Sequence, residues 1–247
     1  MAKRRFDVTQ GPRHGVARIL SKRGLCSRTQ AAEWVRAGRV RVNGQAVFDP
    51  EHPVYGERDQ IEVDGAEAHA SERIYLMLNK PRGVVTTARD EQGRDTVYRC
   101  FDDAALPWIA PVGRLDRASE GLLLFSNDPE WAARIAGIGR IAKVYHVQIG
   151  AVPDAMQLAR LQAGIEDKGE LLKARSVRLL RQGSRNAWLE IVLEAGRNRQ
   201  IRRMLAALDI SVLRLIRIAI GPLPLGDLGK GEWRYLNEEE IKALGQD

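Results

Sequence analysis

The sequence is poor in the residues that cross-link a chain or carry it across a membrane. Its 247 residues include only two cysteines, Cys26 and Cys100, which excludes a disulfide framework and favours a reducing compartment. The longest apolar runs, such as residues 122–125, are far shorter than the roughly 20 residues that span a bilayer. No apolar stretch follows the basic residues 1–5, so we expect no secretory signal and a cytoplasmic protein that does not enter the membrane.

The usual signatures of metal and nucleotide chemistry are also missing. The four histidines do not pair at the spacing of metal ligands, and neither cysteine accompanies one of them. No phosphate-binding loop, dinucleotide-binding glycine pattern or nucleophile-elbow serine is present. We therefore expect an enzyme, if this is one, to work without a metal or a nucleotide cofactor.

The composition is that of a globular protein, with 44% hydrophobic and 29% charged residues. The length suggests one or two domains. The net charge of +7 is unevenly placed, because residues 1–41 contain 11 basic and only two acidic side chains. This asymmetry points to a polyanionic partner. The alternative is a solvated tail followed by an ordinary basic helix.

The N-terminal region has the spacing of two short helices. Apolar residues recur at helical intervals over Val16–Arg23, and Gly24 is placed to end that helix. Ser27 and Gln30 form a capping-box pattern for a second helix, which we expect over Arg28–Ala37.

A small sheet is expected next to these helices. Asn43-Gly44 lies between alternating apolar residues, which is a strong hairpin signal, and a further strand is predicted over Gln60–Val63. We therefore expect a flexible basic arm over residues 1–13 and a small α/β domain over residues 14–65.

Basic side chains gather on this domain. Guanidinium groups suit phosphate contact because each can bind two oxygens at once, although the same face could be merely solvated. The candidate RNA-binding residues are Arg18, Lys22, Arg23, Arg28, Arg36, Arg39 and Arg41.

Two strings in this region, residues 19–28 (ILSKRGLCSR) and 38–44 (GRVRVNG), resemble the S-four RNA-binding domain, named after a protein of the small ribosomal subunit. The resemblance covers about residues 14–65 and implies RNA binding. Since this domain is attached to many kinds of protein, it does not by itself assign an activity.

Residues 66–72 read as a linker, and residues 73–247 as a second domain rich in strands. Helices are expected after Pro153 and from about Asn198. The pattern indicates an α+β protein whose larger domain is a mixed, mainly antiparallel sheet with flanking helices. The predicted strands are 74–78, 84–87, 121–125, 143–149, 176–180, 188–193 and 212–220.

One string of the larger domain, residues 111–124 (PVGRLDRASEGLLL), places Asp116 in a polar loop just before an apolar strand. A carboxylate held at the edge of a rigid sheet is well placed to act as a nucleophile. An aspartate that caps its own turn is the alternative, and the spacing alone does not decide between them.

The same string resembles the central motif of pseudouridine synthases, in the branch that modifies ribosomal RNA and often carries an S-four domain. Further strings resemble other motifs of that branch in the same order along the chain. They are residues 79–84 (NKPRGV), 143–147 (KVYHV), 196–204 (GRNRQIRRM) and 213–221 (LRLIRIAIG).

The resemblance implies a role for each matching residue. Asp116 would be the essential aspartate, although whether it attacks the sugar, attacks the base or assists loss of a sugar proton stays open. Arg202 would be its basic partner, and Tyr145 would stack on the everted uracil. The apolar side of the pocket would come from Leu215 or Ile216. The arginines expected to hold phosphates or structure are Arg114, Arg197, Arg199 and Arg217.

The resemblance therefore implies a cofactor-free enzyme that isomerises a uridine of ribosomal RNA, or of a ribosomal assembly intermediate, to pseudouridine. The residues 119–121 and 231–234 weakly favour large-subunit RNA, and we expect a monomer. One alternative is a non-catalytic RNA-binding or ribosome-assembly protein on the same fold. A transfer-RNA-modifying enzyme is the other.

Overall fold

The computed structural model describes residues 13–88, 90–137 and 141–245, and their contacts divide them into two compact units. The N-terminal unit runs to Ile74 and includes the short segments 106–110 and 127–130, whereas the larger unit contains the remaining residues from Tyr75 onward. The predicted basic arm over residues 1–13 lies, apart from Arg13, outside the described residues.

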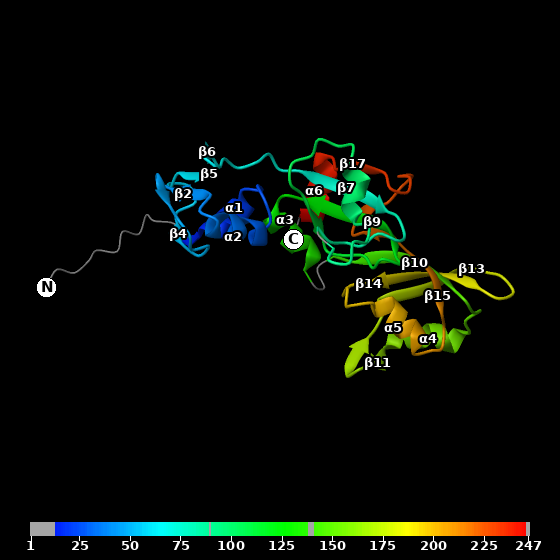
Figure 1. Cartoon of the computed structure of the whole chain (residues 1–247). Helices are drawn as coiled ribbons and strands as arrows, with labels where there is room; N and C mark the ends of the chain where they lie inside the picture. Colours follow the sequence, from blue (N-terminus) through cyan, green and yellow to red (C-terminus); the bar gives the residue numbers. More distant parts are fainter. Residues whose placement is uncertain (1–12, 89, 138–140, 246–247) are drawn as a thin grey trace. The chain divides into compact units, whose positions relative to one another are not determined.

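Two helices of the N-terminal unit, α1 (Val16–Lys22) and α2 (Arg28–Arg36), confirm the sequence expectation. The Ser27 hydroxyl caps α2 by accepting a hydrogen bond from the Gln30 amide at 3.1 Å. Gly24 follows α1 with a φ of +75°, the left-handed conformation that commonly ends a helix. Figure 1 shows both helices in blue beside the small sheet of this unit.

That sheet contains β2 (Val40–Val42), β3 (Gln45–Ala46), β5 (Ile61–Val63) and β6 (Ala66–Glu67) in the order β3-β2-β5-β6. The hairpin turn falls at Asn43 and Gly44, both with positive φ, as its sequence predicts. A separate pair joins β1 (His14–Gly15) to β4 (Pro53–Val54). Since β6 pairs with β5, the predicted linker over residues 66–72 begins inside the sheet, and the compact unit continues to Ile74.

The larger unit is built on a nine-stranded sheet with the order β13-β14-β10-β15-β9-β7-β17, to which β16 and β8 add at β15 and β9. The β9–β15 pair is parallel, whereas β7–β9 and β10–β15 are antiparallel, as expected for a mixed sheet. The strands are β7 (Tyr75–Lys80), β8 (Ala110–Val112), β9 (Glu120–Ser126), β10 (Lys143–Ile149), β13 (Ser176–Gln182), β14 (Ala187–Leu193), β15 (Val212–Ile220), β16 (Leu223–Pro224) and β17 (Trp233–Tyr235).

One strand prediction is wrong. Residues 84–87 form a loop with a single bridge from Val85 to Thr96, and the Thr86 hydroxyl donates to the Leu115 carbonyl oxygen. A small hairpin of β11 (Ile165–Asp167) and β12 (Glu170–Leu172) was not expected from the sequence.

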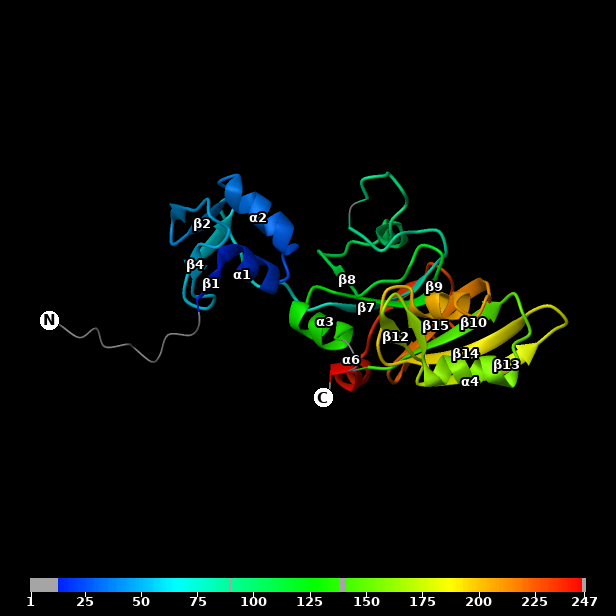
Figure 2. The same ribbon diagram turned by 90° about the horizontal axis from the view of Figure 1, so that it is seen from below.

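Besides α1 and α2, the described residues form the 3₁₀ helix η1 (Val97–Phe101) and the α-helices α3 (Pro129–Ala136), α4 (Ala155–Ala163), α5 (Gln200–Ala206) and α6 (Glu238–Gly245). Figures 1 and 2 show α4 and α5 on the same side of the sheet, near β10 and β14. The core of the larger unit lies at β9, where Leu122–Phe125 are fully buried because strands flank them on both sides and other elements cover both faces.

Candidate active site

The loop between β8 and β9 carries Asp116 and is held by hydrogen bonds to successive backbone carbonyl groups. Every carbonyl from Leu115 to Ser119 accepts a hydrogen bond from a donor that another part of the unit, or the turn itself, supplies. In chain order the donors are Thr86 Oγ1, the Ser119 amide, the Gly83 amide, Arg202 Nη2 and Lys80 Nζ, at distances of 2.8 to 3.1 Å. A loop fixed in this way presents its carboxylate in one position, which is what a catalytic group requires.

Gly121 sets the distance between this loop and β15. Its φ is +102°, and a Cβ atom built at this position would lie 2.2 Å from the carbonyl oxygen of Arg217 on β15. A side chain would therefore push apart the two parallel strands at the point where residue 121 pairs with residue 217. The glycine that follows the motif serves this close approach.

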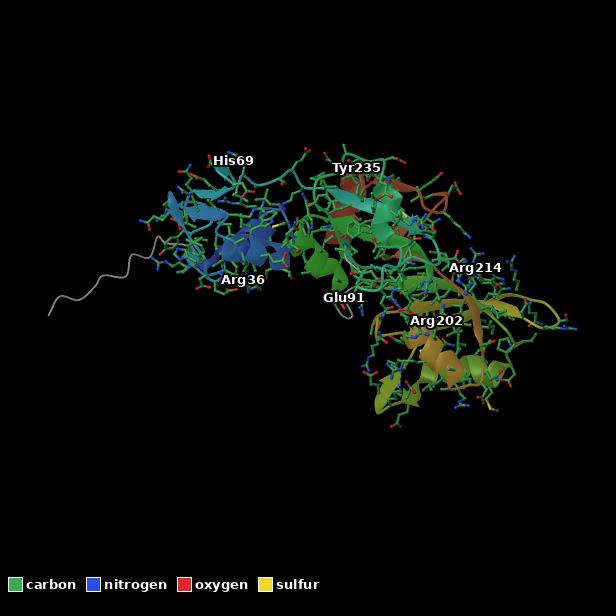
Figure 3. The ribbon with its side chains drawn as sticks, viewed as in Figure 1. Arg36, His69, Glu91, Arg202, Arg214 and Tyr235 are labelled. Carbon is green, nitrogen blue, oxygen red and sulfur yellow. The ribbon has the colours of Figure 1, made fainter. Side chains whose placement is uncertain are left out.

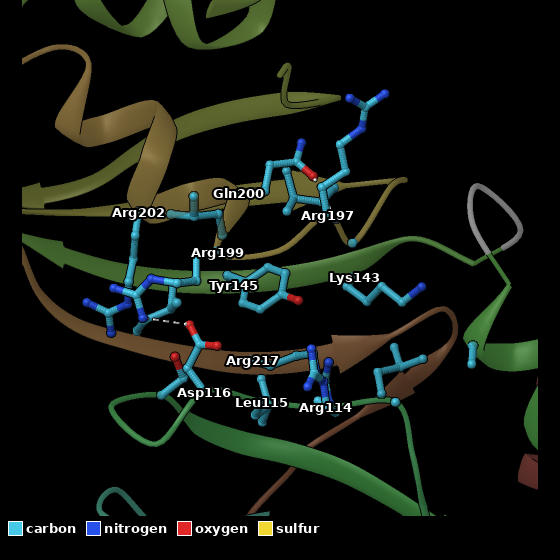
Figure 4. Close-up of a pocket in the computed structure, with 18 of the residues that line it drawn as sticks. Arg114, Leu115, Asp116, Lys143, Tyr145, Arg197, Arg199, Gln200, Arg202 and Arg217 are labelled. Carbon is cyan, nitrogen blue, oxygen red and sulfur yellow. Dashed lines mark hydrogen bonds and ion pairs between the residues drawn. The ribbon is translucent and has the colours of Figure 1, made fainter. Parts of the chain in front are cut away.

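Asp116 lines a pocket of about 170 Å³ in the larger unit. Tyr145 on β10 and Arg217 on β15 are direct cross-strand partners, so their side chains share one face of the sheet. Leu215, two residues before Arg217, also lines the pocket. Figure 4 shows Asp116, Tyr145, Arg202 and Arg217 around the same hollow. The structure thus brings together the three residues to which the sequence assigns chemistry.

The ion pair of Asp116 differs from the sequence expectation. Arg199 Nη1 lies 3.3 Å from Asp116 Oδ2, as the dashed line in Figure 4 indicates, whereas Arg202 donates instead to the Ala118 carbonyl oxygen. In this structure the direct ion-pair partner of the carboxylate is Arg199, and the role of Arg202 as its basic partner stays a prediction. Arg202 holds the loop that carries Asp116, and its Nε is buried without a hydrogen-bond partner.

These two arginines occupy the first turn of α5 and the residue before it. Arg199 has a left-handed backbone with φ +49°, which is uncommon outside glycine and is found at functional sites. Burial lowers the pKa of Arg202, and Arg199 lowers it further, while Asp116 opposes both effects. Arg203, next along the helix, turns away and pairs with Asp167 and Glu170.

The pocket is apolar at Tyr145, which is 8% exposed, and at Leu215, which is 7% exposed. Ile216 does not line the pocket, because successive residues of a strand point to opposite faces and Leu215 takes the inward position. The alternative between Leu215 and Ile216 is thus resolved in favour of Leu215. Arg114 lies at the pocket as expected, with an exposed side chain.

Cationic side chains also lie deeper in the unit. Lys80 is fully buried, and burial lowers its pKa to about 8. Burial also lowers the pKa of Lys143, with Arg217 adding to the effect. Arg217 is 5% exposed and donates from Nε to the Leu122 carbonyl oxygen at 2.6 Å, while its Nη2 is buried without a partner.

A second hollow of about 450 Å³ adjoins the first and shares Arg114, Leu115 and Asp116 with it. Its other walls include Thr87, Gln92 and further polar side chains of the segment after β7. Asp116 therefore lies where the two hollows meet. Together the hollows leave room beside Asp116 for more than the ring of a single nucleotide base.

Several basic residues of the N-terminal unit are already engaged in hydrogen bonds or ion pairs within the protein. Arg23 is not a surface contact, because it donates to the carbonyl oxygens of Gly56 and Ala68 and is partly buried. Ion pairs join Lys22 to Glu130, Arg28 to Glu51 and Arg39 to Asp64.

Arg41 donates to the nearby Gly44 carbonyl oxygen, while Arg18 and Arg36 are exposed and make no ion pair within the described residues. Figure 3 labels Arg36 on α2. In the larger unit, Arg197 lines the pocket and lies 3.5 Å from Glu170.

Three contributors to the site escaped the sequence reasoning. Gln200 is buried at the pocket, where its side chain accepts from the Arg197 amide and donates to the Lys173 carbonyl oxygen. Lys80 braces the loop through Ser119. Glu120 is buried and paired with Arg214 and Lys230. A charged or amide residue inside an apolar strand was the available signal for Lys80 and Glu120.

In the part of the chain that the structure describes, no group of three or more histidine, cysteine or acidic residues is arranged to hold a metal ion. Over the same residues, no helix is long and apolar enough to cross a bilayer.

Comparison with known proteins places this geometry in a family. Residues 74–207 match the RNA pseudouridylate synthase family, and residues 16–61 match the S4 domain. The chain belongs to the RNA pseudouridylate synthase family and is an RNA pseudouridine synthase with an N-terminal S4 domain. The expected family and fold class are thereby confirmed.

Several similar proteins match over nearly the whole chain. An RNA pseudouridine synthase of Aquifex aeolicus is 38% identical over 93% of this chain and 92% of its own. The ribosomal large subunit pseudouridine synthase B of Bacillus subtilis is 35% identical over 92% of this chain and 93% of its own. A crystal structure of a pseudouridylate synthase is similar with a TM-score of 0.65 and 30% identity, covering 95% of this chain and all of that one.

Proposed function

We propose that this chain converts a specific uridine of ribosomal RNA to pseudouridine, with Asp116 as the essential group and without a cofactor. The observation that carries the proposal is the convergence of the Asp116 carboxylate, the Tyr145 ring and the arginine Arg199 on one pocket. Large-subunit RNA is the favoured substrate, because relatives in Bacillus subtilis and Haemophilus influenzae are named for the large ribosomal subunit. We also propose that the protein is cytoplasmic and acts as a monomer that docks on a large RNA.

In this reaction the bond between uracil N1 and ribose C1′ breaks, the base turns over, and C5 joins C1′. The proton on C5 is lost and N1 gains one, so atoms and charge balance without an added reactant. Asp116, one-third exposed at the meeting point of two hollows, can reach the nucleoside. Tyr145 offers a ring face for the everted base and a hydroxyl near the proton that must leave.

The arginines of α5 support this chemistry in different ways. Arg199 supplies a positive charge beside the carboxylate and, being half exposed, can also meet a phosphate. Arg202 acts through the Ala118 carbonyl oxygen and so holds the loop in place. We propose Arg114 and Arg197, at the rim, as further contacts to the RNA backbone.

The N-terminal unit is proposed as the RNA anchor. Arg18, Arg36 and Arg41 are exposed cations that make no ion pair among the described residues, and they carry the proposal. The ion-paired residues Lys22, Arg28 and Arg39 contribute where an RNA phosphate replaces their carboxylate. Arg23 is assigned to the interior of the unit.

The decisive experiment maps pseudouridine across ribosomal RNA from cells with and without this gene, then restores the gene as wild type or as Asp116→Asn. We expect one site to disappear on deletion and to return only with the wild type. An Asp116→Asn protein should bind the RNA within a few fold of wild type, because one carboxylate adds little to phosphate binding. Its turnover should fall by more than about 1,000-fold.

Asp95→Asn is the matched control, since Asp95 is an exposed carboxylate outside both hollows. Full activity of Asp116→Asn, or loss of activity in both variants, would remove Asp116 from its role. An unchanged pseudouridine map on deletion would reject ribosomal RNA as the substrate.

A further inference from the structure

Arg217 has a hydrogen-bonding capacity that the fold leaves unused. Its side chain is 95% buried, since 5% of it is exposed, and its Nε is fixed on the Leu122 carbonyl oxygen at 2.6 Å. Its Nη2 is buried with no acceptor, and Arg217 makes no ion pair within the described residues. Because a buried charged donor without a partner is costly, such an atom commonly marks the place of a ligand.

The residue that carries the unused donor lines the pocket. Arg217 lines the same hollow as Asp116 and is the direct cross-strand partner of Tyr145, with Leu215 on the same face. Figure 4 shows Arg217 beside Tyr145, in the part of the pocket that also contains Arg114 and Lys143. A ring resting on Tyr145 would therefore have its edge within reach of this guanidinium.

Because the Arg217 guanidinium is buried, only the part of a nucleotide that enters the pocket deepest would meet it. The phosphates of a polynucleotide stay at the mouth of the pocket, where the half-exposed Arg199 and Arg197 lie. The part that enters deepest is the base, and uracil offers two carbonyl oxygens as acceptors. A guanidinium bound to a neutral carbonyl oxygen forms a charge-assisted hydrogen bond.

We propose that Arg217 binds the target uracil, with Nη2 donating to one of its carbonyl oxygens. This inference rests on the proposed function and names a further residue of that same site. Arg217 binds and orients the ring, while Asp116 acts on the bond between base and sugar.

The symmetry of uracil gives this contact a second use. The ring turns about the axis through N3 and C6, which exchanges N1 with C5 and at the same time exchanges O2 with O4. A donor fixed on one oxygen before the turn meets the other oxygen after it. Arg217, locked by its bond to Leu122, can thus hold the ring in both orientations without moving.

The test uses synthetic oligoribonucleotides that span the mapped uridine and carry uridine, 2-thiouridine or 4-thiouridine at that position. Sulfur accepts hydrogen bonds more weakly than oxygen, so the substitution weakens one contact at a time. Single-turnover rates are measured for wild type, Arg217→Met and Arg217→Lys, with Arg178→Met as the control. Arg178 is an exposed arginine of β13 outside the pocket.

We expect Arg217→Met to slow conversion of the uridine RNA by about 10- to 100-fold. We also expect at least one thio substitution to slow wild type more than it slows Arg217→Met, whereas Arg178→Met keeps the wild-type pattern. Equal thio effects in wild type and in the Arg217 variants would overturn the contact and leave Arg217 a structural residue.

Folding and substrate are controlled separately. If Arg217→Met does not give the wild-type circular dichroism spectrum, Arg217→Lys, which keeps the positive charge but has neither Nε nor Nη2, carries the same comparison. A wild type that does not convert the uridine RNA rejects the proposed function itself. A wild type that converts it, with thio effects unchanged by either variant, rejects only the role of Arg217.

Discussion

Replacing Gly121 by alanine tests whether the close approach of β9 and β15 builds the site. The new Cβ would lie 2.2 Å from the Arg217 carbonyl oxygen and 2.8 Å from its amide nitrogen, both of which are backbone atoms. Ordinary contact begins near 3.4 Å, so the strands must separate by about 1 Å. The loop with Asp116 ends just before β9, and this separation would move its carboxylate relative to Tyr145.

Two costs contribute to the expected loss of stability. An alanine at φ +102° is strained by about 1–3 kcal/mol, and forced separation of packed strands adds about 1–3 kcal/mol more. Gly83 supplies a matched control, because its φ of +103° is nearly the same while nothing lies within 4 Å of a Cβ there. Gly83→Ala should show the first cost alone.

Urea unfolding and single-turnover conversion of the target RNA would measure both consequences. We expect Gly121→Ala to lose about 1–3 kcal/mol more than Gly83→Ala, and its rate to fall by about 100-fold from a displacement near 1 Å. Equal stability of the two variants, or a Gly121→Ala enzyme that reacts like wild type, would refute the claim that this contact positions Asp116.

Three further changes have distinct expected outcomes. Arg199→Ala should cost less than about 1 kcal/mol of stability, because its ion pair is solvent-exposed, but should lower kcat/KM roughly 10-fold; an unchanged kcat/KM would remove it from the site. Burial lowers the pKa of Lys80 to about 8 in the folded protein, against 10.5 in the unfolded chain. Between these two pH values the unfolded chain keeps the Lys80 proton and the folded protein does not, so the free energy of unfolding should rise with pH in that range. The rise should reach at most about 1.4 kcal/mol per pH unit and vanish in Lys80→Met, as urea unfolding at pH 8 and 9.5 would check. Replacing Arg18 and Arg36 together by glutamine should weaken RNA binding and reduce the slope of log K against log salt by up to about 2, whereas an unchanged slope would exclude them as phosphate contacts.

The long strands of the larger unit could be predicted from the sequence because their signal is local. The expected ranges 143–149 and 212–220 coincide with β10 and β15. The short strand β17 could not, since its three residues become a strand only by pairing with β7, more than 150 positions earlier. The prediction for residues 84–87 fails for the opposite reason, because this β-branched sequence finds only one bridge partner, at Thr96, and therefore stays a loop.

The candidate site was predictable in its members but not in its contacts. Arg199 and Arg202 are three positions apart at the start of a helix, so both fall on one face and either could meet Asp116. In the structure the direct contact falls to Arg199, whose left-handed backbone could not be predicted from the sequence. Likewise, the excess charge of residues 1–41 is partly cancelled by acids that follow later in the chain, such as Glu51, Asp64 and Glu130.

The parallel junction between β9 and β15 explains why residues that are distant in the sequence share one pocket. Antiparallel neighbours on either side, β7 and β10, extend the sheet in both directions from it. The register places the start of β9 beside the middle of β15, so the loop before β9 arrives next to the residues that β15 and β10 present on that face. The register opposes residue 121 to Arg217, so one backbone contact fixes both the carboxylate loop and the proposed uracil donor. It follows that a change at Gly121 should disturb the thio-substitution pattern of Arg217 as well as the rate.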